Sequence, residues 1–221
     1  MPEDTTKKEE KKSLKGRMSC DEHDCEQGLH CFIITKKMSR EIELKPRGMC
    51  QFCGAENVVD WEFVRHRDPN RIEETIVALK NEGIRHKFWC EVELKREAII
   101  HARKKGRVKM REAVEKRIIQ SVGKAKNWRE GSQTPWLGKI ATMYGQHATA
   151  TCCRPCIEHW HGIEQGRDLT KEEVEYLSSL VFQYIEEKIV LTEDGEKAKD
   201  IIKQLQNSPP RAAKKSKGNV H

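Results

Sequence analysis

The sequence lacks a long hydrophobic run, and no segment approaches the ~18 consecutive apolar residues that a membrane-spanning helix requires. Its charged start, MPEDTTKKEEKKSLKGRMS, has no hydrophobic segment behind it, so a secretory signal peptide is not expected. We therefore expect the chain in the reducing cytoplasm. In that compartment, paired cysteines bind a metal more often than they form disulfides.

Apolar residues are also scarce. They make up 36% of the 221 residues, against about 45–50% in typical globular domains, and charged residues make up 35% against about 25%. The core is therefore expected to be small. This gives weight to the nine cysteines, because small domains often depend on a bound metal for part of their folding free energy.

Composition divides the chain into five expected segments, and we find no internal repeat. Residues 1–19 form a charged arm and residues 208–221 a basic tail, both expected to be disordered because they have little apolar surface to bury. Residues 20–49 are rich in cysteine and histidine. Residues 50–190 form the expected main domain, and residues 191–207 a weak C-terminal helix.

Hydrophobic spacing predicts three amphipathic helices in the main domain. Their apolar stripes are Ile72, Ile76 and Leu79 in the first, Met110, Val114, Ile118 and Val122 in the second, and Val174, Leu177, Val181 and Ile185 in the third. Thr170 and Glu173 form a capping box that begins the third helix. Short apolar runs at 32–38, 58–64 and 140–144 predict strands, whereas 84–94 fits a strand or a helix. The expected fold class is α+β and mostly helical.

Two Cys-x-x-Cys pairs stand far apart in the sequence, Cys50 with Cys53 and Cys153 with Cys156. Each pair allows two thiolates to reach one tetrahedral ion, and together they predict a structural zinc site with four cysteines. A knuckle followed by a second pair at a helix start is typical of a treble-clef-like core. Buried cysteines without a metal are the alternative. Cys152 either replaces Cys153 as a ligand, packs behind it, or is a reactive thiol.

A second metal site is possible near the N-terminus, where cysteines and histidines recur without the spacing of a tight knuckle. The candidates are Cys20, His23, Cys25, His30 and Cys31. A segment of unliganded thiols is the alternative, and the irregular spacing does not favour an iron–sulfur cluster.

Several stretches resemble a family of uncharacterised microbial proteins defined by a domain of unknown function. The closest likeness lies in QHATATCCRPC, WHGI and LTKEE, with CQFCG, IRHKFWC and HARKKGRVKM upstream, and it extends over residues 50–190. The resemblance implies membership of that family and carries no activity with it. One departure is Cys90, where the resemblance leads us to expect a histidine, and cysteine keeps that position competent for metal binding.

Histidines near the two pairs suggest a metal-dependent nuclease of the His-Asn-His class, whose catalytic residues sit on a treble-clef frame. In this hypothesis His66 activates water, while His147 or His161 and the acidic Asp68 hold a second divalent ion. The long insertion between the two pairs and the lack of a central asparagine count against it. The alternative is that each histidine is a surface or core residue.

Positive charge concentrates in residues 95–129, which hold thirteen lysines and arginines against three glutamates. One helical stripe of this segment carries Arg96, Arg103, Arg107 and Arg111. Such a stripe suits contacts with the phosphates of DNA or RNA, between which the sequence does not discriminate. Trp128 and Trp136 could stack on bases or cover the core. A solvated helix face is the alternative.

The sequence therefore predicts a cytoplasmic, zinc-binding protein that contacts nucleic acid through a basic helix. A metal-dependent nuclease and a protein-binding adaptor are the alternatives. If zinc holds the fold together, Cys53→Ser or Cys156→Ser should lose both metal and fold, whereas His66→Ala should keep both.

Overall fold

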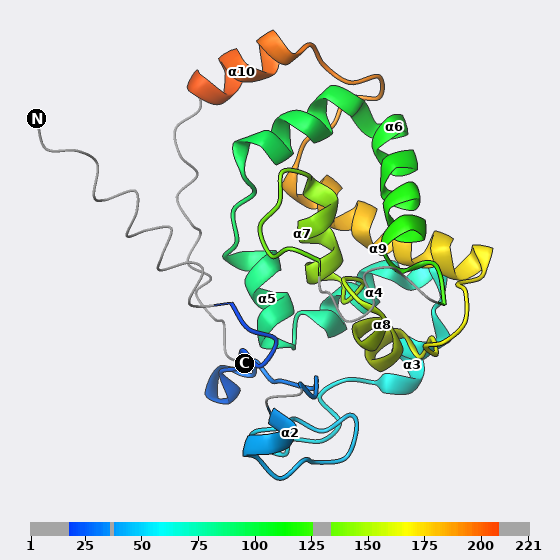
Figure 1. The fold of residues 1–221 in the computed structure, drawn as a ribbon. Helices are drawn as coiled ribbons and strands as arrows, with labels where there is room; N and C mark the ends of the chain where they lie inside the picture. The colour runs from blue at the N-terminus through cyan, green and yellow to red at the C-terminus, as the bar shows by residue number, and fades with distance from the viewer. Residues whose placement is uncertain (1–17, 36–37, 126–133, 208–221) are drawn as a thin grey trace, which may run out of the picture.

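The architecture is helical in the part of the chain that the structure, a computed structural model, describes: residues 18–35, 38–125 and 134–207. Extended pairing within these ranges is limited to two isolated bridges, Asp24 with Leu29 and His30 with Glu82. The helices in Figure 1 are η1 (Cys25–Gln27), α2 (Met38–Glu41), α3 (Trp61–His66), η2 (Pro69–Arg71), α4 (Ile72–Leu79), α5 (Gly83–Cys90), α6 (Arg96–Val122), α7 (Ala141–Ala148), α8 (Arg154–His161), α9 (Lys171–Lys188) and α10 (Ala198–Asn207). The arm and tail expected to be disordered lie almost wholly outside the described ranges.

The expected strands are not formed in the described residues. Helix α3 begins within 58–64, where the Asp60 carboxylate accepts a hydrogen bond from the Phe63 backbone N–H at 2.9 Å. Most of 140–144 belongs to α7. Short apolar runs fit helices as well as strands, and here capping and helix packing decide. The α+β prediction is therefore wrong in its strands, while a mostly helical chain is confirmed.

The helices expected from hydrophobic spacing are present as α4, α6 and α9. Their predicted apolar stripes are buried, except that Ile72 is only partly covered. Helix α9 begins at the expected capping box: the Thr170 hydroxyl accepts from the Glu173 backbone N–H at 3.2 Å, and the Glu173 carboxylate accepts from the Thr170 N–H at 2.9 Å. None of the helices in the described ranges has the length and apolar character that crossing a membrane requires.

A sharp bend divides α6, as Figure 1 shows, and it lies at Gly106, whose φ is 70° and ψ −179°. This region of backbone space is essentially restricted to glycine. A turn containing Gly195 occupies the space beside Gly106, and the Arg107 backbone N–H donates to the Thr192 carbonyl at 2.8 Å. The bend therefore attaches the segment that leads into α10.

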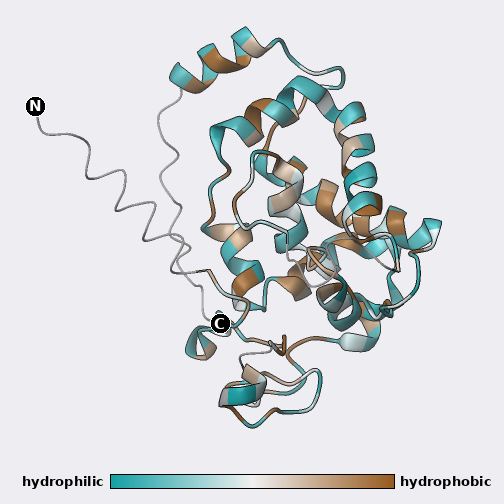
Figure 2. Cartoon of the chain, viewed as in Figure 1, coloured by the Kyte–Doolittle hydropathy of each residue, from teal (hydrophilic) through white to brown (hydrophobic). Residues whose placement is uncertain are grey.

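Two hydrophobic clusters organise the described residues. The larger forms where α6 and α7 pack on α9 and α5 packs on α7, and Figure 2 shows the outer turns of α6 to be mostly hydrophilic. The smaller cluster forms around α3 and α8, where the ring of Phe32 meets the edge of Trp160. Cysteines from several segments contribute to this second cluster, so the candidate metal ligands lie there.

Candidate metal centre

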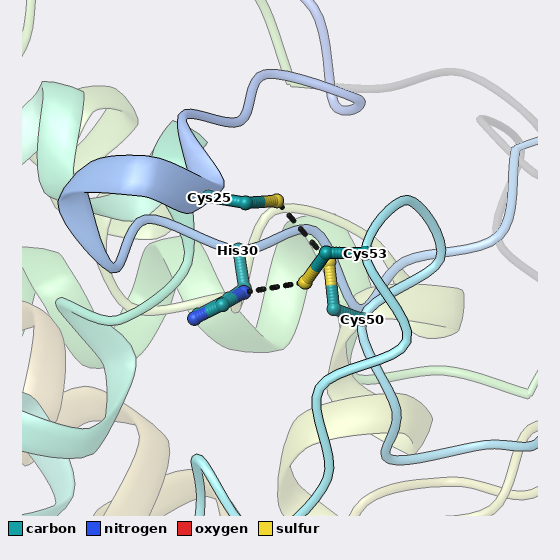
Figure 3. A group of neighbouring side chains, drawn as sticks. All are labelled: Cys25, His30, Cys50 and Cys53. Carbon is teal, nitrogen blue, oxygen red and sulfur yellow. Dashed lines mark hydrogen bonds between the residues drawn. The ribbon is translucent and has the colours of Figure 1, made fainter.

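Four candidate ligands converge at the border of the smaller cluster, as Figure 3 shows: Cys25, His30, Cys50 and Cys53. One ligand atom from each residue lies within 4.8 Å of all the others. Cys50 is buried, whereas Cys53 is exposed at the edge of the group. Three sulfurs and one imidazole nitrogen form a ligand set that structural zinc sites commonly use.

The spacings between the ligand atoms fit a single tetrahedral ion. The Cys25 and Cys50 sulfurs are 3.7 Å apart, and the Cys53 sulfur is 3.4 Å from His30 Nδ1. A tetrahedral zinc ion, with Zn–S near ~2.3 Å and Zn–N near ~2.0–2.1 Å, gives edges of about 3.8 Å between sulfurs and about 3.5 Å between sulfur and nitrogen. These two distances therefore match zinc coordination, and the remaining ligand atoms lie within 4.8 Å of one another.

A tight backbone turn positions the Cys50–Cys53 half of the site. The Gly54 N–H donates to the Cys50 carbonyl at 3.0 Å, and the Cys50 N–H donates to the Ala55 carbonyl at 3.0 Å. Gly54 has a φ of 79°, which is why glycine suits this position. The turn matches the knuckle expected from Cys-x-x-Cys-Gly.

The other half comes from the segment between Cys25 and His30. Asp24 caps the short helix η1, which carries Cys25, by accepting from the Gln27 N–H. His30 is fixed on both sides of its backbone, since its N–H donates to the Asn81 carbonyl and its carbonyl accepts from the Gly83 N–H, each at 2.8 Å. The link between α4 and α5 therefore holds the histidine ligand in place.

The electrostatics of Cys25 and Cys50 favour a bound cation. Burial raises the pKa of Cys50, but backbone hydrogen bonds from Cys31, Cys53 and Phe52 outweigh it, and the pKa falls to about 6. Burial, followed by the neighbouring Cys53 and Cys50, raises the pKa of Cys25 to about 12. One thiolate thus forms readily, and the next is opposed by the sulfur already there. A metal cation removes that opposition.

The structure does not bring the four predicted cysteines together. Cys50 and Cys53 belong to the group just described, whereas Cys153 and Cys156 belong to a separate group with Cys152. Cys153 is the N-cap of α8 and Cys156 lies in its first turn, so their sulfurs meet the neighbouring Cys152 of the same segment. The expected single site is thus replaced by two groups, and the treble-clef arrangement that depends on it is not confirmed.

The N-terminal candidates also separate. Cys25 and His30 enter the four-residue group, but the others do not. The His23 ring stacks on Phe52 with centroids 3.5 Å apart, and the buried Cys31 thiol donates to the Ile33 carbonyl at 3.5 Å. The Cys31 thiol also donates to the backbone carbonyl of Cys20 at 3.6 Å. These three residues support the site from its surroundings.

A buried ion pair lies between the two cysteine groups, and the sequence analysis missed it. The guanidinium of Arg85 is 2.9 Å from the carboxylate of Glu82, and both side chains are fully buried. Glu82 also accepts from the Trp160 indole at 2.8 Å and from the Phe32 N–H at 3.4 Å, and Arg85 donates to the Cys156 sulfur at 3.4 Å. Charged residues are usually predicted to be exposed, so no sequence pattern indicated this buried pair.

The histidines of the nuclease hypothesis do not assemble into a site. His147 and His161 are fully buried and contact backbone carbonyls through Nε2, at Thr134 (2.8 Å) and Thr149 (3.0 Å). Burial lowers the pKa of His147 to about 3 and of His161 to about 4, so both are neutral core residues.

His66 and Asp68 lie at neighbouring helix ends. His66 is the last residue of α3, and Asp68 caps η2 by accepting from the Asn70 N–H at 2.8 Å. No group of three or more potential metal ligands in the described ranges includes either of them or the two buried histidines. Nuclease activity therefore stays a prediction from the sequence, without a geometry that supports it.

The basic stripe of α6 contacts the chain's own C-terminal half. Arg103 makes a two-pronged ion pair with Glu196 (2.7 and 2.5 Å), and Arg107 pairs with Glu186 at 2.8 Å. The remaining two arginines also point to the chain itself, Arg111 over the Phe182 ring at 4.2 Å and Arg96 to the carbonyl of Ile202 at 3.5 Å.

Contact with nucleic acid through these arginines likewise stays a prediction. Trp136 is partly buried against the larger cluster, where its ring stacks on His147 with centroids 4.5 Å apart. Trp128 lies outside the described residues.

Residues 73–186 match the family described as Domain of unknown function (DUF4186). The chain belongs to this family. The match runs from α4 to α9 and is shorter than the expected 50–190. The DUF4186 region therefore includes the second cysteine group and both buried histidines, while all four ligands of the first group precede it. No solved structure matches the chain.

Proposed function

We propose that this DUF4186 protein binds one structural zinc ion through Cys25, His30, Cys50 and Cys53. The observation that carries the proposal is the mutual approach of these four ligand atoms within 4.8 Å. The sulfur–sulfur spacing of 3.7 Å lies close to the edge of a zinc-centred tetrahedron. Soft thiolates with one imidazole favour zinc over the hard cations that prefer oxygen ligands.

A structural role follows from the number of ligands. Four protein ligands complete a tetrahedral shell, whereas catalytic zinc sites keep one position open for water or substrate. The ligands come from two segments, one around η1 and one around the Cys50–Cys53 turn, so the ion would join them. The His30 contacts to Asn81 and Gly83 connect the joined segments to the DUF4186 region. Zinc thus fastens the N-terminal part of the chain to the helical domain.

The test is zinc content per chain in protein purified without added metal or chelator. Cys53→Ser is the variant of choice because Cys53 is exposed, and replacing it leaves the hydrophobic cluster intact. We expect this variant to contain one zinc equivalent less than the wild type. Cys90→Ser, a matched change at an exposed cysteine outside both groups, should keep the wild-type content. Equal zinc content in Cys53→Ser and wild type would overturn the proposal.

A further inference from the structure

A second group of metal ligands lies inside the DUF4186 region and has no part in the proposed zinc site. The sulfurs of Cys152, Cys153 and Cys156 all lie within 4.8 Å of one another. Cys152 and Cys156 are each only 2% exposed, and Cys153 is partly exposed. Three thiols gathered in so small a space could share one metal ion, form a disulfide, or pack as small core residues.

Local structure holds the three sulfurs in place. Cys153 is the N-cap of α8, and both Pro155 and Cys156 lie in the first turn of the helix. The Cys152 carbonyl accepts from the Thr134 hydroxyl at 3.1 Å, which fixes the residue before the helix. The Cys152 and Cys156 sulfurs are 3.6 Å apart. Three sulfurs around one ion at ~2.3 Å would be separated by about 3.8–4.0 Å, close to this spacing.

A buried guanidinium faces this group. The side chain of Arg85 is fully buried, and its Nη2 donates to the Cys156 sulfur at 3.4 Å. Its other donors go to the His147 carbonyl at 2.6 Å and to Glu82 at 2.9 Å. An N–H group directed at a sulfur stabilises the thiolate form, as the outer partners of metal ligands do in characterised sites. Arg85 thus supplies positive charge where deprotonated sulfurs would bring negative charge.

We propose that Cys152, Cys153 and Cys156 bind one thiophilic metal ion with sulfur ligands alone, and that Arg85 stabilises the bound thiolates. The ion belongs to the class that thiolates select, of which Cu(I) and Zn(II) are the single-ion members. The described residues provide no fourth cysteine, histidine or carboxylate at this group. Cu(I), which is softer than Zn(II) and does not need a complete tetrahedron of protein ligands, therefore suits it better.

The main competing explanation is a disulfide formed between two of the three cysteines. Rapid thiol–disulfide exchange requires accessible thiols, and two of the three, Cys152 and Cys156, are buried. A disulfide would also use only two of the three sulfurs and leave Arg85 directed at a neutral group. Metal binding uses all three sulfurs and the guanidinium, so the arrangement favours it.

The experiment is a metal titration of chelator-treated, reduced full-length protein with Zn(II) and, separately, with Cu(I) under anaerobic conditions. Competition with a coloured chelator gives the number of sites for each ion. The wild type should bind two equivalents of the ion that fits the three-cysteine group. Cys53→Ser should still bind one, at the three-cysteine group. Cys153→Ser should lose the equivalent at the three-cysteine group, and Cys90→Ser should bind as the wild type does. A second Zn(II) or a second Cu(I) equivalent identifies the ion.

Two results would overturn the inference. One is a Cys53→Ser protein that binds neither ion. This test leaves the three-cysteine group unchanged, so it remains decisive even if Cys153→Ser fails to fold. The other is an intact mass of the untreated protein about two hydrogens below that of the reduced chain, with a disulfide mapped to this group. The inference does not rest on the proposed zinc site, because loss of metal in Cys53→Ser tests that site separately.

Discussion

The carboxylate of Glu82 and the guanidinium of Arg85 form an ion pair at 2.9 Å in which both side chains are fully buried. The Glu82 carboxylate accepts from the backbone N–H of Phe32, two residues after His30, and Arg85 donates to the sulfur of Cys156 in the second cysteine group. The pair therefore connects the segment that carries His30 with the helix that carries Cys156. Its placement leads to the first prediction.

Removing one member of this pair should destabilise the protein strongly. Glu82→Gln leaves the Arg85 charge buried without its carboxylate, and breaking a buried pair in this way costs about 3–5 kcal/mol. Urea denaturation of wild type and variant measures the change in the free energy of unfolding. Lys124→Ala is the matched control, since the Lys124–Asp168 pair is exposed (68% and 52%) and such pairs contribute at most about 1 kcal/mol. Equal effects of the two substitutions would contradict this assignment.

Gly106→Ala should destabilise the protein more than alanine at a glycine of positive φ with open space around it. A Cβ at Gly106 would collide with the backbone of Glu193 and Gly195, in addition to the backbone strain of about 1–3 kcal/mol. Gly166→Ala provides the control, because Gly166 has a φ of 81° with no atom within 4 Å of the added carbon. Thermal unfolding of both variants should give the larger loss for Gly106→Ala. A similar loss in both would mean that the turn does not pack against the bend.

Arg103→Ala should lower stability by about 1.5–3 kcal/mol, the range for hydrogen bonds to charged groups. Its side chain is only 16% exposed and makes two hydrogen bonds to Glu196. Lys104→Ala changes an exposed neighbour on the same helix and should be nearly neutral. The denaturant concentrations at the midpoint of unfolding compare the stabilities of the two variants. If Arg103 instead served nucleic acid, its substitution would leave stability unchanged and weaken salt-dependent binding.

Acid should destabilise the protein as the buried histidines gain protons. Burial lowers the pKa of His161 from 6.5 to about 4 in the folded chain, so the unfolded chain binds more protons between these values. Stability is fully present above pH 6.5 and falls as the pH drops towards 4, with a slope of up to about 1.4 kcal/mol per pH unit for one group. His161→Gln should make the dependence of unfolding free energy on pH less steep than in wild type. Parallel profiles for the two proteins would contradict this prediction.

Much of the helical framework was predictable, because hydrophobic spacing reports directly which face of a helix is buried. The stripe from Met110 to Val122 and the capping box at Thr170 are examples. The run at 140–144 was not predictable, since five residues fit either periodicity and only packing on α9 decides. The Gly106 break was also missed, because its cause is a turn almost ninety residues later in the sequence.

The candidate ligands were predictable as residues but not as groups. The Cys-x-x-Cys-Gly pattern predicted the turn at Cys50 and Cys53, because the geometry of such a turn is set by neighbouring residues. Which other ligands approach this turn depends on tertiary packing. His30 is held by contacts with the α4–α5 link that no local pattern encodes, and Cys25 lies in the same segment. Pairing the knuckle with Cys153 and Cys156 assumed that similar spacing implies a shared ion, and the two segments belong to separate groups.

The position of the first ligand group also sets how far the loss of its ion would spread. All four ligands precede residue 73, whereas the larger hydrophobic cluster is built mainly from helices that follow it. Chelation should therefore release the N-terminal segment as a local opening and leave the helices beyond α4 cooperative. Protease cleavage confined to residues before 73 would report this local event. An ion bound there would control the attachment of one segment and not the folding of the whole protein.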